Sequence, residues 1–358
     1  MGSLLKILIH PVFGYTSTRM VLAALTTLII TIFLGPFFIK KLYELKIGQA
    51  VSRLSDVPVL DERHAKKKDT PSMGGVLILS AVIVSTLLWN QFLAPQTLLL
   101  LLATVVLGVL GALDDYIKLR KRKQQGLSAK AKMGAQIVLG LIVGYSVLHL
   151  KSPLPYFFPF IKAPLFITGG VISLFLTLFV VIGSSNSVNL TDGLDGLAAG
   201  CILFACLVLA AFAFVSNNME TAKYLNLMYL EGSGEIAIFL SSVFGATLGF
   251  LWYNGHPAQV FMGDTGSLAL GGILGVSAVL LRREFLLALV GGIFVVEALS
   301  VILQVASYRL RNKKRIFLCA PLHHHFEYKG WPETKVVLRF WIVSLILALI
   351  GLASIKLQ

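Results

Sequence analysis

Charged residues are scarce in this 358-residue chain, and their scarcity excludes an ordinary soluble domain. Asp, Glu, Lys and Arg together make up 13% of the residues, whereas a soluble domain carries roughly a quarter. Apolar residues make up 56% of the chain, and the mean hydropathy is +0.83. The sequence therefore predicts an integral membrane protein.

Cysteine and the common nucleotide-binding motifs are also scarce or missing. Of the three cysteines, Cys201 and Cys206 fall in an apolar run, and Cys319 has no partner at the spacing of a metal site. Neither a disulfide framework nor a zinc site is therefore indicated. The patterns GxxxxGK[ST] and strand-linked GxGxxG do not occur, which argues against a soluble-type NTPase site.

Long apolar runs, by contrast, recur from one end of the chain to the other. About 20 residues of helix cross a bilayer core, so we predict an all-α, polytopic integral membrane protein with about ten transmembrane helices. One transmembrane domain is expected over residues 1–358, and residues 1–18 are expected to form an interfacial segment. The predicted spans are 20–39, 74–93, 95–113, 132–150, 168–189, 194–215, 235–253, 264–281, 285–308 and 337–356.

The net charge of +14 is concentrated in alternate loops. Segments 40–73, 115–132 and 309–339 hold eight, seven and eight of the 31 lysines and arginines. The positive-inside rule therefore predicts that these three loops are cytoplasmic and that both termini lie outside. Topology and attraction to anionic lipid account for the basic charge, so no nucleic-acid partner is expected.

Unusual polar residues gather at the same predicted membrane face. Asp114 and Asp115 end the third span, Asp192 and Asp195 separate the fifth from the sixth, and Asp264 opens the eighth. Carboxylates near hydrocarbon are costly and repel one another, so their clustering points to function. The other polar residues at this face are Asn186, Asn189, Asn254, His256, His323, His324 and His325.

Each cluster taken alone also has a structural explanation. Asp114 and Asp115 could end a helix and pair with the basic run that follows. Asp192 and Asp195 could be a cap and a turn residue, although their i,i+3 spacing would place both on one face of a helix. Asp264 could be an N-cap that accepts backbone N–H groups, and the three histidines could be solvated in a loop.

Together the clusters favour one kind of chemistry. Mg²⁺ prefers oxygen ligands and is typically held by one or two carboxylates plus substrate phosphates. A helix start after glycine offers N–H groups to phosphate, and cationic side chains neutralise phosphate oxygens during transfer. The sequence predicts Mg²⁺-dependent phosphoryl-group transfer that involves a lipid phosphate, in a cleft at the cytoplasmic face.

Five motifs, in chain order, resemble those of the bacterial phospho-N-acetylmuramoyl-pentapeptide transferase family. They are TPSMGG (70–75), LDDYIKL (113–119), NLTDGLDGLA (189–198), FMGDTGSL (261–268) and PLHHHFE (321–327). The family belongs to the polyprenyl-phosphate N-acetylhexosamine-1-phosphate transferase superfamily. Its members share the Asp motifs, and HHHFE resembles the muramoyl-pentapeptide branch.

The resemblance implies a reaction in the bacterial inner membrane. UDP-N-acetylmuramoyl-pentapeptide and undecaprenyl phosphate would give lipid I and UMP, with Mg²⁺ as cofactor and a homodimer as the assembly. Asp264 is implied as the metal ligand and Asp114 as the base or acceptor-orienting group. Asp115 beside it and His323 are also implied as catalytic.

The resemblance also implies which residues bind the substrates. The uridine and donor pocket would be formed by Leu190, Asp192, Gly193, Asp195, Asn254 and Phe261, with Phe261 stacking. The polar cleft would be lined by Lys67, Ser72, Lys118, Lys132 and Asn189. His323, His324 and His325 would contact the diphosphate and sugar.

Two alternatives stay open at this point. A relative that uses an N-acetylglucosamine donor would share the Asp motifs. A non-catalytic transporter or flippase of a phosphorylated ligand is favoured by Glu297, an ionisable residue inside a predicted span. Against transport, the other polar residues lie at one face and not at the midplane, where transporter sites usually lie.

Overall fold

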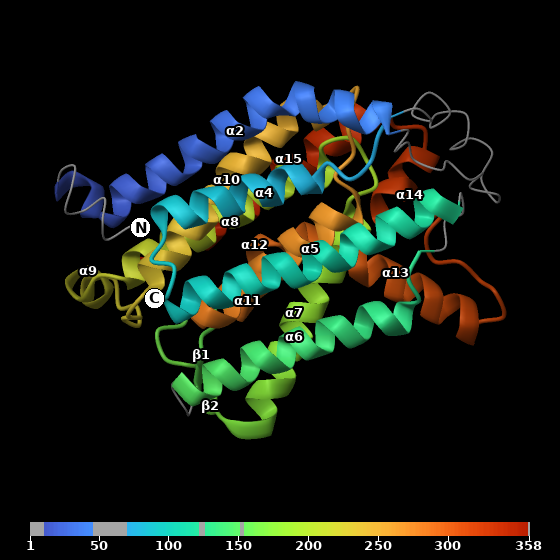
Figure 1. The fold of residues 1–358 in the computed structure, drawn as a ribbon. Coiled ribbons are helices and arrows are strands. Elements are labelled where there is room, and N and C mark those ends of the chain that lie inside the picture. The colour runs from blue at the N-terminus through green and yellow to red at the C-terminus, as the bar shows by residue number, and fades with distance from the viewer. Residues whose placement is uncertain (1–10, 46–69, 122–125, 151–153, 357–358) are drawn as a thin grey trace.

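Helices form almost all of the structure in the computed structural model, which describes residues 11–45, 70–121, 126–150 and 154–356 (Figure 1). Short strands β1 (Leu154–Tyr156) and β2 (Phe166–Thr168) pair antiparallel, with Pro155 opposite Ile167. The helical elements are η1 (Pro11–Gly14), α2 (Thr16–Glu44), α4 (Gly75–Trp89), α5 (Pro95–Lys121), α6 (Ala129–Leu150), α7 (Gly170–Thr191), α8 (Leu197–Ser216), α9 (Met219–Tyr224), α10 (Ser233–Asn254), α11 (Gly263–Leu281), α12 (Glu284–Val290), α13 (Gly292–Leu310), α14 (Leu322–Tyr328) and α15 (Glu333–Ala353).

The prediction of an all-α polytopic membrane protein is confirmed. Among the described residues, nine helices are long and apolar enough to cross a membrane. The predicted span 74–93 is represented by α4, which has only 15 residues. The predicted span 285–308 is divided into α12 and α13 at Gly291 and Gly292, because a pair of glycines weakens the continuity of a helix.

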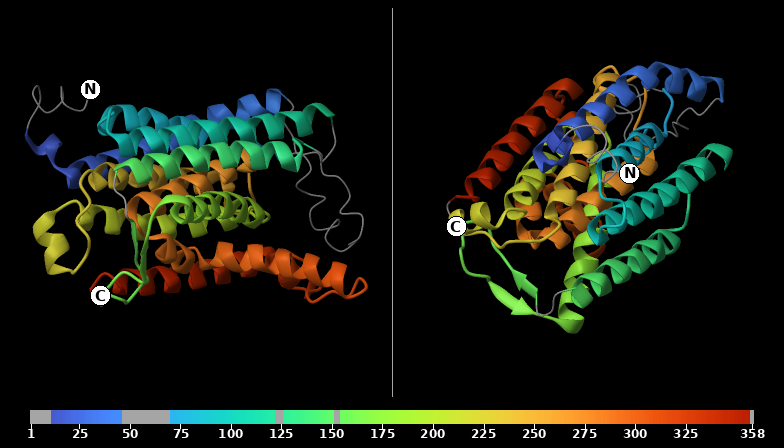
Figure 2. Two further views of the ribbon diagram at one scale, coloured as in Figure 1. Left: turned by 90° about the horizontal axis from the view of Figure 1, so that it is seen from below. Right: turned by 60° about the vertical axis from the view of Figure 1, so that its left-hand side comes forward.

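Helices α10 and α11 form the centre of the bundle. In their spans 78% and 89% of the residues are buried, against 28% in both α2 and α13. Figure 2 shows the long helices side by side, with α5 and α6 along one side and α13 and α15 along the other. Gly271 and Gly275 of α11 meet α7 so closely that a side chain at either position would clash, as expected where small residues let membrane helices approach.

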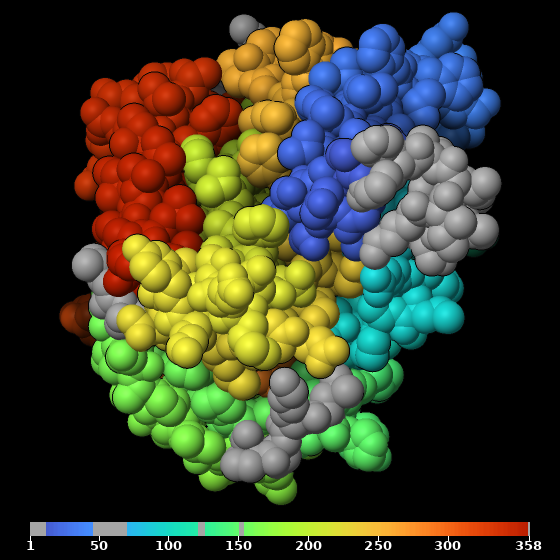
Figure 3. All heavy atoms as spheres, turned by 90° about the vertical axis from the view of Figure 1, so that its left-hand side faces the viewer, coloured from blue at the N-terminus to red at the C-terminus, as the bar shows by residue number. Residues whose placement is uncertain are grey.

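A buried ion pair joins α2 to α10 at the end of the bundle opposite α14. Arg19 Nη2 donates to both carboxylate oxygens of Glu235 at 2.8 Å, and the two residues are 5% and 6% exposed. Asn90, after the end of α4, also donates to Glu235. Figure 3 shows this end of the molecule, where α9 and the segments around it cover the middle of the face.

Candidate active site

Three carboxylates from two helices meet at the end of the bundle that holds α14. Asp114 and Asp115 lie in the last two turns of α5, and Asp264 lies in the first turn of α11. One carboxylate oxygen from each lies within 4.8 Å of the others. Gly111, one turn before Asp114, makes this approach possible, because a side chain there would clash with the backbone of Asp264.

The segment TPSMGG positions the start of α11. Phe261 donates its N–H to the carbonyl of Pro71 at 2.8 Å, and Gly74 donates to the carbonyl of Phe261 at 2.8 Å. Gly263 has φ of +75°, a left-handed conformation that favours glycine. Ser72 is only 7% exposed and packs against this glycine, so the structure gives it a contact with the turn before Asp264.

Asp115 caps α11 from the neighbouring helix. Its carboxylate accepts the N–H groups of Asp264 at 3.2 Å and Thr265 at 3.0 Å, and the Thr265 hydroxyl at 2.7 Å. The alternative that Asp264 is an ordinary N-cap is therefore wrong, since its own side chain lies within the first turn. Because Asp115 caps the helix, the Asp264 carboxylate does not serve as the cap and contacts Lys118 and Lys132 instead.

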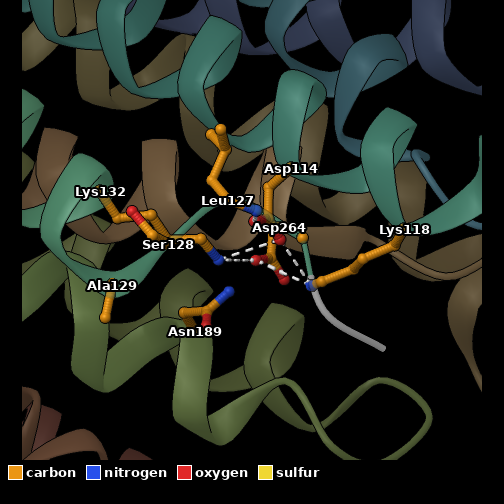
Figure 4. Close-up of a pocket in the computed structure, with 9 residues that line it drawn as sticks. Asp114, Lys118, Leu127, Ser128, Ala129, Lys132, Asn189 and Asp264 are labelled. Atoms are coloured by element: carbon orange, nitrogen blue, oxygen red, sulfur yellow. Dashed lines mark hydrogen bonds and ion pairs between the residues drawn. The ribbon is translucent and has the colours of Figure 1, made fainter. Parts of the chain in front are cut away.

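Two lysines bridge Asp114 and Asp264 (Figure 4). Lys118 Nζ lies 2.7 Å from Asp114 Oδ2 and 3.1 Å from Asp264 Oδ2. Lys132 Nζ, from α6, lies 2.9 Å and 2.7 Å from the same two atoms. Asp114 Oδ1 accepts the N–H of Leu127 at 2.6 Å. The expected pairing of Asp114 with the basic run is thus present, but it forms part of a four-residue cluster.

A cavity of about 570 Å³ opens beside this cluster. Its wall includes a segment that the sequence analysis missed, residues 126–129. The hydroxyl of Ser128 accepts the N–H of Ala131 at 3.3 Å, as an N-cap does, and a Ser before an apolar run was an available signal for this helix start. The lining residues are Asp114, Lys118, Gly126, Leu127, Ser128, Ala129, Lys132, Asn189 and Asp264.

Asp192 and Asp195 have separate environments. The segment between α7 and α8 forms a turn, so the two carboxylates do not share a helix face. Burial, together with repulsion from Asp264 and Asp115, raises the pKa of Asp192 to about 8. Asp192 is therefore close enough to Asp115 and Asp264 for their charges to affect its own.

Asp195 belongs to a second group of polar residues. Its Oδ2 lies 2.9 Å from His256 Nδ1 and accepts the N–H of Ala258 at 3.2 Å. Its backbone N–H donates to Glu333 at 2.8 Å, at the start of α15. Asn254 lies nearby and joins the turn to the next loop, since it accepts the N–H of Gly196 and donates to the carbonyl of Val260.

The other residues predicted to bind the substrates have fewer contacts that define a role. Asn189 lines the cavity and donates to Ser267 at 2.8 Å. Leu190 and Phe261 are half-buried, and Phe261 contributes the backbone hydrogen bonds that hold the TPSMGG segment. Lys67 lies outside the described residues.

The three histidines occupy the short helix α14 and not an open loop. His323 is fully buried, and its ring meets Gly193 so closely that a side chain there would clash with Nε2. His324 Nδ1 lies 2.7 Å from Glu327. His325 accepts the N–H of Leu318 at 3.1 Å, so it holds the connection before α14.

Glu297 of α13 supports this helix. It is fully buried and accepts the N–H groups of Leu322 at 2.7 Å and His323 at 3.0 Å. Its carboxylate also lies 3.2 Å from His323 Nδ1. These contacts account for an ionisable residue inside a span without a transport pathway.

The carboxylates fit a divalent metal ion. The group Asp114, Asp115 and Asp264 offers oxygen ligands alone, which is the ligand type that Mg²⁺ prefers. Asp115 is hydrogen-bonded to the start of α11, whereas Asp114 and Asp264 line the cavity. A second group, Asp195, His256 and Glu333, also has ligand atoms within 4.8 Å of one another.

Comparisons with known proteins agree with this geometry. Residues 97–282 match the family model described as glycosyl transferase family 4, and residues 67–79 match signature 1 of phospho-N-acetylmuramoyl-pentapeptide-transferases. Proteins with that name from Protochlamydia amoebophila, Desulfotalea psychrophila and Syntrophus aciditrophicus are 55%, 52% and 47% identical to the chain. Each match covers 97% of this chain and 95% of the relative.

The family-4 match contains every residue that lines the cavity. The family-4 match runs from α5 through α11 and includes the two lysines and the three clustered carboxylates. The signature overlaps the segment that holds the start of α11.

Proposed function

Since the chain belongs to the phospho-N-acetylmuramoyl-pentapeptide transferases of glycosyl transferase family 4, we propose the reaction that its site performs. The chain is a multi-pass membrane enzyme of peptidoglycan synthesis. Its donor is UDP-N-acetylmuramoyl-pentapeptide and its acceptor is undecaprenyl phosphate. The products are lipid I and UMP.

The observation that carries this proposal is the cluster of Asp114, Lys118, Lys132 and Asp264 at the cavity. Each lysine ammonium lies within 3.1 Å of both carboxylates. When a phosphate enters the cavity, the same ammonium groups are close enough to exchange a carboxylate partner for a phosphate oxygen. Cationic side chains placed in advance stabilise the charge that moves between phosphates during transfer.

We propose that Asp264 and Asp114 have different roles in the transfer, one toward Mg²⁺ and the other toward the acceptor. We assign Asp264 as the metal ligand and Asp114 as the group that orients the acceptor phosphate. When bound, Mg²⁺ would neutralise phosphate oxygens and polarise the reacting phosphoryl group. Asp115 keeps the start of α11 in place through its three hydrogen bonds.

In the proposed transfer, an oxygen of undecaprenyl phosphate attacks the phosphorus that carries the sugar. A new P–O bond forms, and the bond between that phosphorus and the oxygen of the UMP phosphate breaks, so that UMP leaves with the electron pair. Direct attack is favoured because Asp114 is a poor nucleophile here: one oxygen accepts the Leu127 N–H and the other lies near two ammonium groups.

The donor is proposed to lie beside the turn between α7 and α8. Asp192, Gly193 and Asp195 come from this turn, Asn254 holds it, and His323 packs against it. Leu190 and Phe261 are proposed to contact the uridine, and Lys67, Ser72 and Asn189 to line the polar cleft. His324 and His325 are proposed to contact the diphosphate and sugar.

The membrane orientation follows from the charge pattern. We propose that the site faces the cytoplasm, that both termini lie outside, and that residues 1–358 form one domain in a bacterial inner membrane. The basic loops support this orientation. The start of α2 and the end of α15 lie at the end of the bundle opposite α14 (Figure 1), as the proposal requires. A homodimer is proposed from the family resemblance.

The donor assignment is tested by comparing two nucleotide sugars with the purified protein in detergent. With undecaprenyl phosphate and Mg²⁺, we expect UMP release from UDP-N-acetylmuramoyl-pentapeptide and at most background release from UDP-N-acetylglucosamine. Faster release from the N-acetylglucosamine donor would identify the related transferase activity. No UMP from either donor would support a transporter and would contradict the proposal.

A further inference from the structure

The buried ring of His323 has a nitrogen, Nε2, whose lack of a hydrogen bond the helix packing does not explain. The residue is fully buried, and neither ring nitrogen makes a hydrogen bond among the described residues: Nδ1 has the Glu297 carboxylate beside it, whereas Nε2 has no polar neighbour of this kind. Leaving a buried polar atom unpaired costs about 1–3 kcal/mol, so such an atom calls for an explanation. The nitrogen lies against Gly193, in the turn where the proposed function places the donor.

The opposite side of the ring faces Glu297. The Glu297 carboxylate is 3.2 Å from Nδ1, and it also accepts the backbone N–H groups of Leu322 and His323. A carboxylate beside Nδ1 favours the proton on that nitrogen and leaves the Nε2 lone pair free in the neutral ring. The three contacts also restrict how the start of α14 can turn.

The position of Gly193 completes the arrangement. Gly193 is exposed, and the atom nearest to a Cβ placed on it would be His323 Nε2. Any side chain at this position would occupy the space of the ring. An O–H or N–H group of a nucleotide sugar at the turn would therefore supply the hydrogen-bond donor that Nε2 lacks.

We propose that Glu297 is a positioning residue for the transfer reaction, because it holds the proton of His323 on Nδ1 and presents Nε2 to the donor as a hydrogen-bond acceptor. The proposal rests on the proposed function for the identity of the donor. The geometry of Glu297, His323 and Gly193 is independent of that identity. Glu297 acts only through His323 and α14, and it does not contact the donor.

The variant that tests the proposal is Glu297→Gln. Its amide oxygen can still accept the N–H of His323, while its NH₂ group takes the place of Oε2, gives up the hydrogen bond from Leu322 and donates to Nδ1, so that the proton is favoured on Nε2. We expect kcat/KM for the donor to fall about 10- to 100-fold, by analogy with the loss caused when the outer partner of a metal-bound histidine is changed. The KM for undecaprenyl phosphate and the half-saturating Mg²⁺ concentration should change less than about twofold.

A double-mutant cycle separates positioning from folding. In the His323→Ala background, Glu297→Gln should cause little further loss, because a residue that acts through His323 has no effect without it. Ser300→Ala is the matched control on the same helix, since Ser300 donates to the backbone carbonyl of Glu297 and not to its carboxylate, and it should keep full activity. A further loss in the double variant equal to that in the single variant would overturn the proposal.

The tautomer itself is read without any turnover. Selective ¹⁵N-histidine labelling, with His323→Gln to assign the resonance, should show the wild-type ring protonated at Nδ1 and the Glu297→Gln ring protonated at Nε2. A wild-type ring protonated at Nε2 would overturn the proposal even if the enzyme is active. The expected tautomer in a protein that releases no UMP would instead place the failure in the proposed function.

Discussion

Asp264→Asn is expected to lower turnover on the order of 10³-fold or more without unfolding the protein. Asn has nearly the same size, but it removes one of the two carboxylates that face Lys118 and Lys132. It also removes the anionic oxygen that we assign to Mg²⁺, so excess Mg²⁺ should restore little activity. The start of α11 should persist, because Asp115 caps that helix through the backbone of Asp264 and Thr265.

The matched control is Glu235→Gln, which makes the same chemical change at a buried carboxylate far from the cavity. Removing the charge of a buried, paired carboxylate leaves Arg19 uncompensated and should lower the melting temperature. Turnover at a permissive temperature should be kept. The measurements are melting temperature, Mn²⁺ affinity and UMP release on both variants. Full metal affinity or strong turnover in Asp264→Asn would defeat the metal assignment.

Asp114→Asn and Asp115→Asn are expected to fail for different reasons. Asp114 lines the cavity, and its replacement should nearly abolish turnover while Mg²⁺ and uridine nucleotide still bind. Asp115 accepts three hydrogen bonds at the start of α11, and an amide accepts with one oxygen only. Loss of a helix cap costs about 0.5–2 kcal/mol, so Asp115→Asn should lower the melting temperature as well as turnover.

Three measurements on the two purified variants distinguish these outcomes: thermal melting, binding of UMP in the presence of Mg²⁺, and turnover at saturating donor. The assignment of Asp114 to the acceptor predicts that Asp114→Asn still binds UMP in the presence of Mg²⁺. If Asp115→Asn melts normally and only Asp115→Asn loses turnover, then Asp115 and not Asp114 is the acceptor-orienting group.

Sequence patterns located the main polar groups because each stands out against an apolar span. Asp114, Asp264 and the histidines follow or precede runs of hydrophobic residues, and the membrane limits where such residues can lie. The apolar runs also predicted the helical class, since a bilayer admits few other structures. The shortness of α4 and the break at Gly291 were not predicted, although the pair Gly291 and Gly292 was a visible signal for the break.

The roles inside the site depend on tertiary packing and could not be read from spacing. Asp115 and Asp264 are far apart in the sequence, so nothing local indicates that the first caps the helix of the second. Likewise, the pairing of Glu297 with α14 appears only when α13 and α14 meet. Asp192 and Asp195 were compatible with a helical face, but the chain turns there and separates them.

Removal of divalent metal tests the central claim most directly. Purified protein is given UDP-N-acetylmuramoyl-pentapeptide and undecaprenyl phosphate, and UMP is measured after EDTA treatment and again after Mg²⁺ is returned. We predict that UMP release falls to background with EDTA and recovers fully with Mg²⁺, because the carboxylates at the cavity act through a bound ion. UMP release that continues unchanged in EDTA would contradict the account.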